Sequence, residues 1–120
     1  MYLINGVEVS KEEFNIPVEN LAIWRGDGIF EAIAIHKGYL FGIDKHMERF
    51  AQSAEKMFFN NINFQEIKDN LISIASNYDD GYMRVIIGRG LDKDKSDVYI
   101  FYQELINFPE SLSLIHISEP

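Results

Sequence analysis

Arginine is the residue type in this 120-residue chain that is best suited to hold an anion, and four arginines stand against seven lysines among its 11 basic side chains. A guanidinium can bind phosphate or carboxylate through two parallel hydrogen bonds, and it keeps its charge throughout the physiological pH range. Arg49 precedes an apolar helical position, Arg84 lies in the middle of an apolar alternation, and Arg89 stands between two glycines. Each of them taken alone is more often a solvated or ion-paired surface residue. Convergence of several arginines would favour an anion site.

The sequence offers few other groups that could carry chemistry. Its three histidines, His36, His46 and His116, lie far apart without the spacing of a metal site, so we expect no bound metal. It contains neither a nucleophile elbow nor a phosphate-binding Walker loop. The run at residues 26–28, Gly-Asp-Gly, could approach a ligand closely, although a turn before a strand is the simpler interpretation.

Composition and charge narrow the function classes. The chain carries 19 acidic and 11 basic residues, a formal net charge of −8, which argues against general nucleic-acid binding. It has no cysteine, which excludes a disulfide scaffold and thiolate zinc sites and gives no sign of an oxidising compartment. We see neither a secretory signal nor a membrane-spanning stretch, and therefore expect a cytoplasmic chain that binds no membrane.

Alternating apolar residues predict the strands of the fold. In residues 29–35 the large aliphatic residues occupy odd positions, which is the period of a β-strand. Asn5-Gly6 predicts an N-terminal hairpin, because both residues tolerate positive φ. A turn at residues 36–38 predicts a second hairpin. Two further strands are expected over residues 82–87 and 98–102.

Two segments between these strands have the three-to-four-residue period of amphipathic helices. The first is expected to begin at Asp44 as N-cap. The second covers residues 63–75, with Asn63 as N-cap and Glu66 completing a variant of the capping box. The helices are grouped rather than alternating with strands. The predicted fold is therefore α+β, an antiparallel sheet of about five to six strands with two helices packed on it.

We expect residues 1–110 to form one domain, because domains of roughly 100–150 residues are the commonest. An apolar content of 47% is enough for a core of that size. Residues 111–120 form a tail that ends without a cap. Two interpretations of the tail stay open, a further strand over residues 112–117 or a non-native translated end.

Five motifs occur in a fixed order and spacing. They are RGDGIFE at residues 25–31, KGYLF at 37–41, DKHMERF at 44–50, SAEK at 53–56 and YMRVIIGRG at 82–90. Together they resemble the N-terminal domain of the class IV pyridoxal-phosphate-dependent aminotransferases, which include branched-chain aminotransferase, D-amino-acid aminotransferase and aminodeoxychorismate lyase. The resemblance covers residues 2–105 and implies the fold of that domain, with the family's C-terminal domain absent from this chain.

The resemblance implies roles for the arginines and for one strand. The arginine of the family's His-x-x-Arg motif binds the cofactor phosphate, and that residue is Arg49 here. The family's strand after Gly-Asp-Gly lines the substrate pocket, and residues of the same parity share one face of a sheet. Arginines of the second strand region could hold a substrate carboxylate. The expected substrate-binding residues are therefore Phe30, Ala32, Ala34, Arg84 and Arg89.

The family's catalytic lysine has no counterpart in this chain. Family members take their Schiff-base lysine from the second domain, and pyridoxal-phosphate transamination requires it. The seven lysines here, none at a matching position, are Lys11, Lys37, Lys45, Lys56, Lys68, Lys93 and Lys95. The resemblance therefore implies half of an active site, with no catalytic residue in this chain, and a fragment that is inactive alone.

These observations leave three hypotheses for the function. The first is the N-terminal portion of an aminotransferase that uses pyridoxal 5'-phosphate, acts on an amino acid and a 2-oxo acid, and forms a homodimer when full length. The second keeps the fold and the cofactor but releases pyruvate, as the aminodeoxychorismate lyase of the folate pathway does. The third is a stand-alone binding or dimerisation domain without catalysis.

Overall fold

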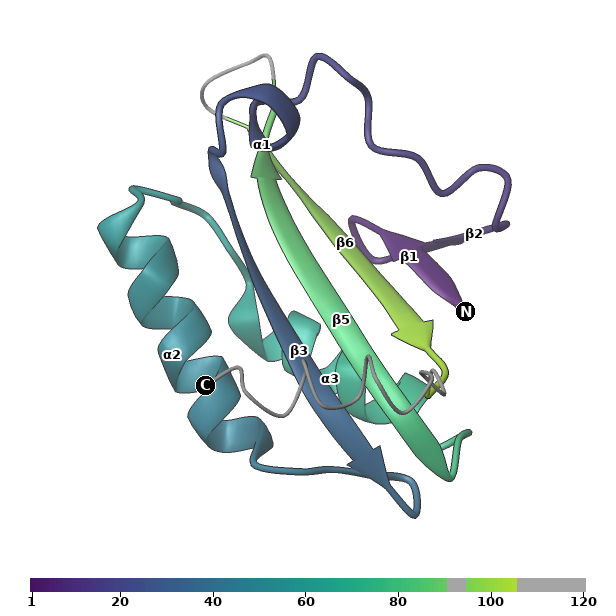
Figure 1. Ribbon diagram of the computed structural model, residues 1–120. Helices are drawn as coiled ribbons and strands as arrows, with labels where there is room; N and C mark the ends of the chain where they lie inside the picture. Colours follow the sequence, from purple (N-terminus) through teal and green to yellow (C-terminus); the bar gives the residue numbers. More distant parts are fainter. Residues whose placement is uncertain (91–94, 106–120) are drawn as a thin grey trace, which may run out of the picture.

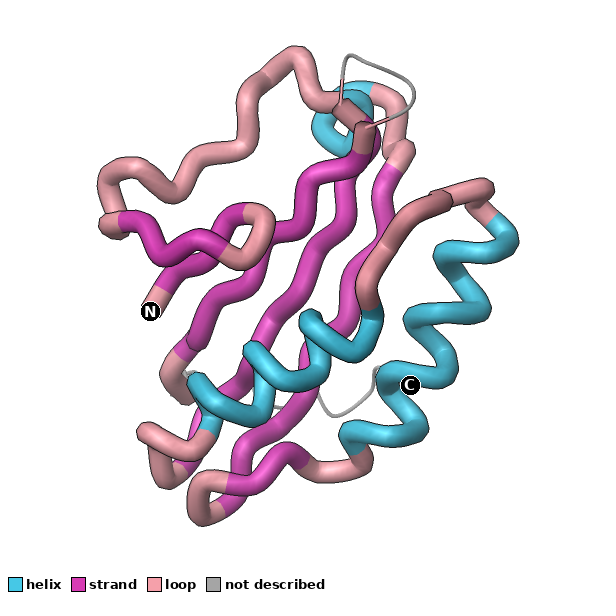
Figure 2. The backbone as a smooth tube through the Cα atoms, turned by 180° about the vertical axis from the view of Figure 1, so that it is seen from behind, coloured by secondary structure: helices cyan, strands magenta, loops and turns pink. Residues whose placement is uncertain are grey.

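The computed structural model describes residues 1–90 and 95–105, apart from the side chain of Trp24. Within these residues a six-stranded antiparallel sheet carries two long helices on one of its faces (Figure 1; Figure 2). The predicted α+β fold, an antiparallel sheet with two helices packed on it, is confirmed. The predicted tail, residues 111–120, lies outside the described residues.

The sheet is built by strands from both ends of the chain. The strands are β1 (Tyr2–Ile4), β2 (Val7–Val9), β3 (Gly28–His36), β4 (Tyr39–Leu40), β5 (Asp80–Arg89) and β6 (Ser96–Gln103). Their order in the sheet is β2-β1-β6-β5-β3-β4, and every neighbouring pair is antiparallel. β5 pairs with β3 along the whole of β3, whereas β4 pairs only with Ile35 and His36 at its end. The edge of β3 that faces away from β5 therefore has a strand partner only at Ile35 and His36.

The two predicted hairpins form at the predicted turns. Asn5 and Gly6 have φ angles of 52° and 80°, and Lys37 and Gly38 have φ angles of 50° and 82°. Two successive positive φ values match the right-handed twist of the flanking strands, and Asn-Gly adopts them with little strain. The turn residues therefore set the register of both hairpins.

The core lies between the sheet and the helices α2 (Ile43–Lys56) and α3 (Phe64–Ala75). Ile33, at an odd position of β3 as the alternation predicts, is fully buried there. Phe50 from α2 and Leu71 from α3 are fully buried against the same face. Burial of each such side chain stabilises the fold by about 1.5–3 kcal/mol.

The start of one helix agrees with the sequence prediction and the start of the other does not. Asn63 is the N-cap of α3, and its side-chain oxygen accepts the backbone N–H of Glu66 at 3.0 Å. The prediction of Asp44 as the N-cap of α2 is wrong, because the N-cap is Gly42, two residues earlier, at φ 68°. Asp44 lies in the first turn instead and accepts a 2.8 Å hydrogen bond from Lys68 of α3.

A short helix that the sequence analysis did not predict, α1 (Leu21–Trp24), covers one end of the sheet (Figure 1). Its N-cap Asn20 is buried and accepts the backbone N–H of Ala22 at 3.0 Å. A Cβ on Gly88 would lie 2.7 Å from Asn20 Oδ1, and one on Gly28 would lie 2.9 Å from the Cβ of Ala22. These two glycines therefore allow α1 to approach β3 and β5 closely.

Gly88→Ala is expected to lower the free energy of unfolding by about 1–3 kcal/mol, because the new methyl group must displace Asn20 and α1. Gly90→Ala is the matched control, since a Cβ there would meet its nearest neighbours at an ordinary 3.6 Å. Urea unfolding of both variants gives the comparison. Equal stability of the two variants would contradict the close packing of α1 on the sheet.

Candidate active site

Most of the predicted substrate-binding residues lie on the sheet face opposite the helices, which we call the open face. Phe30, Ala32 and Ala34 have the parity of this face along β3, opposite to that of the buried isoleucines. Arg84 of β5 lies directly opposite Ala32 in the register. The structure therefore brings four of the five predicted residues onto one surface, where Phe30 is 68% exposed.

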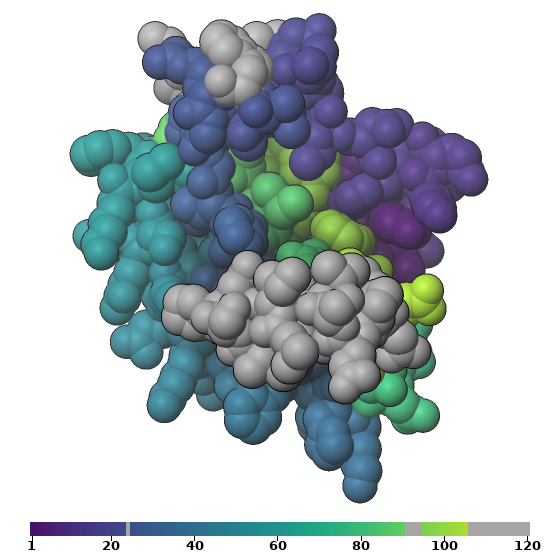
Figure 3. Space-filling model, viewed as in Figure 1, coloured from purple at the N-terminus to yellow at the C-terminus, as the bar shows by residue number. Residues whose placement is uncertain are grey.

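The N-terminal segment covers the β1–β6 half of the open face (Figure 3). Its Phe14 packs on three aromatic rings of these strands, with ring centroids 5.0 Å away for Tyr2, 5.9 Å for Tyr99 and 5.5 Å for Phe101. Such tilted and edge-on arrangements are favourable for aromatic pairs. Among the described residues, this segment leaves the β3–β5 half of the open face uncovered.

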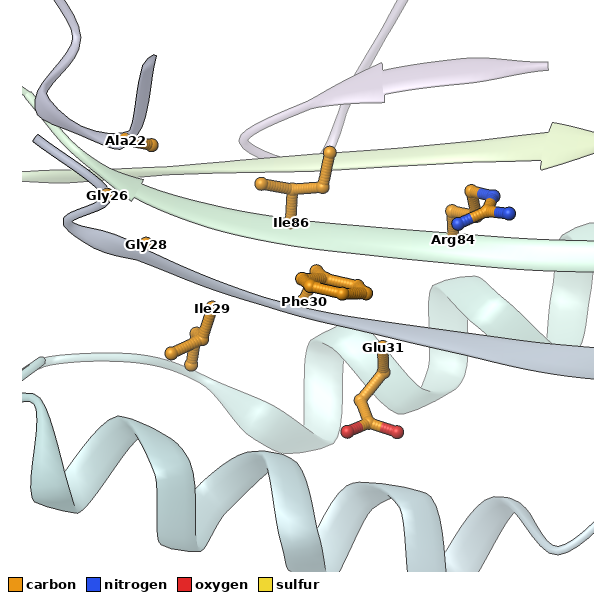
Figure 4. Close-up of a pocket in the computed structure, with 8 residues that line it drawn as sticks. All are labelled: Ala22, Gly26, Gly28, Ile29, Phe30, Glu31, Arg84 and Ile86. Atoms are coloured by element: carbon orange, nitrogen blue, oxygen red, sulfur yellow. The ribbon is translucent and has the colours of Figure 1, made fainter. Parts of the chain in front are cut away.

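A cavity of about 350 Å³ opens on this β3–β5 half (Figure 4). It is lined by Ala22, Gly26, Gly28, Ile29, Phe30, Glu31, Arg84 and Ile86. The side chains of Phe30 and Ile86 supply apolar surface on the open face, and Glu31 points away toward the helices (Figure 4). A volume of a few hundred Å³ with apolar walls and a few polar groups is typical of small-molecule sites.

Arg84 is the cation of this cavity. Its side chain is half-buried, and its Nε donates a hydrogen bond to Oε1 of Gln103 on β6. This bond uses one of the five N–H donors of the guanidinium and fixes the direction of the side chain. The amino groups at its tip can bind a carboxylate.

Arg49 on α2 forms an ion pair with Glu31 of β3. Its Nε donates to Glu31 Oε2 at 3.0 Å, and its Nη2 donates to Glu31 Oε1 at 2.6 Å. Nδ1 of His46 lies 2.7 Å from the same Oε1, and a proton on Nδ1 makes this contact a hydrogen bond to the carboxylate. The Glu31 side chain is 7% exposed, whereas that of Arg49 is 65% exposed.

The surroundings of Glu31 keep its carboxyl ionised. Burial raises the pKa of the Glu31 carboxyl, but the hydrogen bonds and charges of Arg49 and His46 together lower it by more. The resulting pKa is below its usual range. Because the carboxylate is charged, it holds the Arg49 guanidinium by charge-assisted hydrogen bonds, which are the stronger kind.

This lowered pKa predicts an acid-dependent loss of stability. The Glu31 pKa in the folded chain lies below the value of about 4.3 expected in the unfolded chain. Its contribution to stability is therefore complete above about pH 5 and is lost as the pH falls through the folded pKa. Glu31→Gln lacks this titration, so the difference in unfolding free energy between wild type and variant should shrink below about pH 4. Urea unfolding across this pH range measures it, and a difference that stays constant would contradict the lowered pKa.

Arg89 lies on the helix side of the sheet, apart from the other predicted substrate-binding residues. Its Nε donates to Asp27 Oδ2 at 2.8 Å, and its Nη2 donates to the backbone carbonyl of Met57 at 2.6 Å. The guanidinium carbon also lies 4.3 Å from the centre of the Phe59 ring. These contacts join the segment before β3 to the end of α2. A role of Arg89 toward a substrate carboxylate stays a prediction.

Glu31 is the residue of this site that the sequence analysis did not single out. Within residues 29–35 it occupies one of the odd positions that otherwise hold large aliphatic residues. The alternation therefore puts a carboxylate on the buried face, where it requires a partner. This break in an apolar pattern was the available signal, since such breaks concentrate at functional sites.

A family model described as amino-transferase class IV matches residues 28–118, which is most of the chain. The chain belongs to the class IV aminotransferases. This membership confirms the resemblance indicated by the five motifs. The match includes β3, α2 and β5, the elements that carry Glu31, Arg49 and Arg84.

Individual class IV relatives show the same likeness. The chain is 41% identical to a D-alanine aminotransferase of Staphylococcus epidermidis over 54 residues, which are 45% of this chain and 19% of that protein. It is 27% identical to a putative branched-chain-amino-acid aminotransferase of Methanocaldococcus jannaschii over 94 residues, which are 73% of this chain and 32% of that protein.

Solved class IV structures share the fold. A hypothetical aminotransferase from Mycobacterium tuberculosis, in a PLP-bound form, matches with a TM-score of 0.78 and 21% identity, over 88% of this chain and 40% of that chain. The 4-amino-4-deoxychorismate lyase of Pseudomonas aeruginosa matches with a TM-score of 0.73 and 17% identity, over 92% of this chain and 42% of that chain. The chain thus spans less than half the length of each of these four proteins.

Proposed function

We propose that this chain is the N-terminal domain of a pyridoxal-phosphate-dependent aminotransferase, with residues 1–110 as the domain and residues 111–120 as a tail. The full-length enzyme would transfer an amino group between an amino acid and a 2-oxo acid. Membership in the class IV aminotransferases supports both the cofactor and the class of reaction.

The observation that carries this proposal is that Glu31 bonds only one edge of the Arg49 guanidinium. The Nε and Nη2 atoms of Arg49 donate to the Glu31 carboxylate. The guanidinium has further N–H donors, and the Arg49 side chain is 65% exposed. Glu31 belongs to β3, the strand whose open face lines the cavity, and its side chain holds Arg49 on the helix side of the same strand. A guanidinium held on a rigid helix suits a phosphate dianion, and these donors therefore fit the phosphate of the cofactor.

The open face would supply the substrate side of the site. Phe30 would contact the apolar part of the amino acid, and the small side chains of Ala32 and Ala34 would leave room for it. Arg84 would bind a substrate carboxylate through the amino groups at its tip, a role that Arg89 is also predicted to have. When bound, pyridoxal phosphate supplies an electron-withdrawing ring that weakens the bonds at the Cα of the amino acid.

We further propose that the lysine that bonds to the cofactor lies in a part of the full-length enzyme outside these 120 residues. The lysines of the described segments, which are all but Lys93, do not line the open-face cavity. Lys68 of α3 is instead paired with Asp44, which raises its pKa through a hydrogen bond and the opposite charge. The chain alone would then be inactive.

An assay of the 120-residue chain and of the full-length enzyme tests these proposals. Each is incubated with pyridoxal phosphate, D-alanine or L-leucine, and 2-oxoglutarate, and amino-group transfer is followed by glutamate formation. We expect transfer by the full-length enzyme with one of the two amino acids and none by the chain. Amino-group transfer by the 120-residue chain would contradict the proposal that the cofactor-bonding lysine lies outside it. Pyruvate release from aminodeoxychorismate by the full-length enzyme, without a 2-oxo acid, would identify the lyase instead.

We also propose that the full-length enzyme is a cytoplasmic homodimer. Large apolar side chains at the chain surface support a further packing partner, and Tyr39, Phe41 and Phe58 are 79%, 76% and 78% exposed. The lack of cysteine fits a compartment in which disulfides do not form. None of the helices in the described segments has the length and apolar character needed to cross a membrane.

A further inference from the structure

Glu31 is a buried charge to which the proposed function assigns no role of its own. Its side chain is 7% exposed, on a face of β3 where its odd-numbered neighbours Ile29 and Ile33 belong to the core. A buried carboxylate lowers stability unless its oxygens are bonded. Both oxygens are bonded here, and both partners, His46 and Arg49, come from α2. The contact therefore ties the strand that lines the cavity to the helix that carries Arg49.

The geometry of this contact fixes the plane of the Arg49 guanidinium. The bond from Nε to Oε2 is 3.0 Å long and the bond from Nη2 to Oε1 is 2.6 Å long, so two neighbouring donors face the two carboxylate oxygens. Two parallel hydrogen bonds define the orientation of a planar group as well as its position. They leave both N–H groups of Nη1 and one of Nη2 for another ligand.

His46 is a second partner of the Glu31 carboxylate. Its Nδ1 lies 2.7 Å from Oε1 of Glu31 and 3.3 Å from Nη2 of Arg49. With the proton on Nδ1, the imidazole donates to the carboxylate and restrains it. The carboxylate is therefore restrained by His46 as well as by Arg49.

We propose that Glu31 is the positioning residue for Arg49, holding the guanidinium so that its free edge is preset for the phosphate of the cofactor. The inference rests on the proposed function, in which Arg49 binds that phosphate. An exposed arginine samples many rotamers, and ordering it on binding weakens affinity. Glu31 orders the Arg49 side chain when the chain folds. Binding of the ligand therefore costs little further side-chain entropy.

The charge of Glu31 acts in the opposite direction. A carboxylate 2.6 Å from the guanidinium offsets part of the positive charge that attracts the phosphate. If charge dominated, Glu31→Gln would bind phosphate more tightly than wild type. If positioning dominates, as we propose, the same variant binds more weakly. Glutamine has nearly the shape of glutamate, so the sign of the effect separates the two.

The test measures binding of pyridoxal 5'-phosphate and of pyridoxal, which lacks the phosphate, to the 120-residue chain. Glu31→Gln is expected to weaken binding of the phosphorylated ligand by about 10-fold, the lower end of the loss of roughly 10- to 100-fold that follows removal of a group orienting a metal-binding side chain. Binding of pyridoxal should be unchanged. In an Arg49→Lys background, Glu31→Gln should have almost no further effect, because lysine has no planar fork to orient. Glu48→Gln, which removes a carboxylate at an exposed position of α2, is the matched control.

A measurement without ligand completes the test. The Nε–Hε signal of Arg49 in a ¹⁵N NMR spectrum should exchange slowly with water in the wild type and rapidly in Glu31→Gln. Rapid exchange in the wild type would overturn the positioning role, even if the variant failed to fold. Equal or tighter phosphate-dependent binding by Glu31→Gln would also overturn it. If Arg49→Lys and wild type bind the phosphorylated ligand equally well, the proposed function of Arg49 fails instead.

Discussion

Phe50→Ala is expected to lower the free energy of unfolding by about 3–5 kcal/mol, the usual cost of emptying a buried phenylalanine site. Phe50 is fully buried between α2 and the sheet, and its ring meets that of Phe64 edge-on at a centroid distance of 6.0 Å. A single domain is commonly stable by only about 5–15 kcal/mol, so this loss would remove a large part of the total. Thermal and urea unfolding followed by circular dichroism measure it.

The neighbouring residue provides the control for this prediction. Arg49 precedes Phe50 on the same helix, but its side chain is 65% exposed and pairs with Glu31. Arg49→Ala leaves Glu31 Oε1 with His46 but takes the Arg49 hydrogen bond from Oε2, so it should lower the free energy of unfolding by less than Phe50→Ala does. A destabilisation by Arg49→Ala as large as that by Phe50→Ala would show that the Glu31 contact, and not the apolar core, holds α2 on the sheet.

Arg49→Ala is expected to weaken binding of pyridoxal 5'-phosphate by about 100-fold, because it removes charge-assisted hydrogen bonds to the phosphate. Binding of pyridoxal should change little, because it has no phosphate. A fluorescence titration of the same chain with both ligands measures the two affinities. Lys45→Ala removes a cation at an exposed position of the same helix, without a place in the Glu31 contact, and controls for net charge. Equal losses in the two variants would contradict a specific phosphate site at Arg49.

Two local sequence signals, in which one or two residues decide the geometry, predicted the secondary structure correctly. Asn5-Gly6 predicted a hairpin because its two residues tolerate positive φ, and Asn63 predicted a helix start because its side chain can accept a backbone N–H. Asp44 carries the same signal, yet Gly42 begins the helix and Asp44 pairs with Lys68. That ion pair joins α2 to α3, and the capping signal, which is read from one helix alone, does not reveal it.

The candidate site was predicted in part for the same reason. Strand parity was enough to place Phe30, Ala32 and Ala34 on one surface. The position of Arg84 beside them depends on the register between β3 and β5, and the engagement of Arg89 depends on the chain folding back on Asp27. These relations join residues that are far apart in the sequence, so alternation and spacing alone do not reveal them.

The most direct test of the account is a map of amide and side-chain NMR shifts while the 120-residue chain is titrated with pyridoxal 5'-phosphate. We predict saturable shifts centred on Arg49, Glu31 and the open-face residues Phe30 and Arg84. Shifts centred elsewhere, for example on the pocket that Asn5 and Asn63 line on the helix side, would contradict the proposed site. Shifts of the same size and midpoint with pyridoxal would contradict a phosphate site at Arg49.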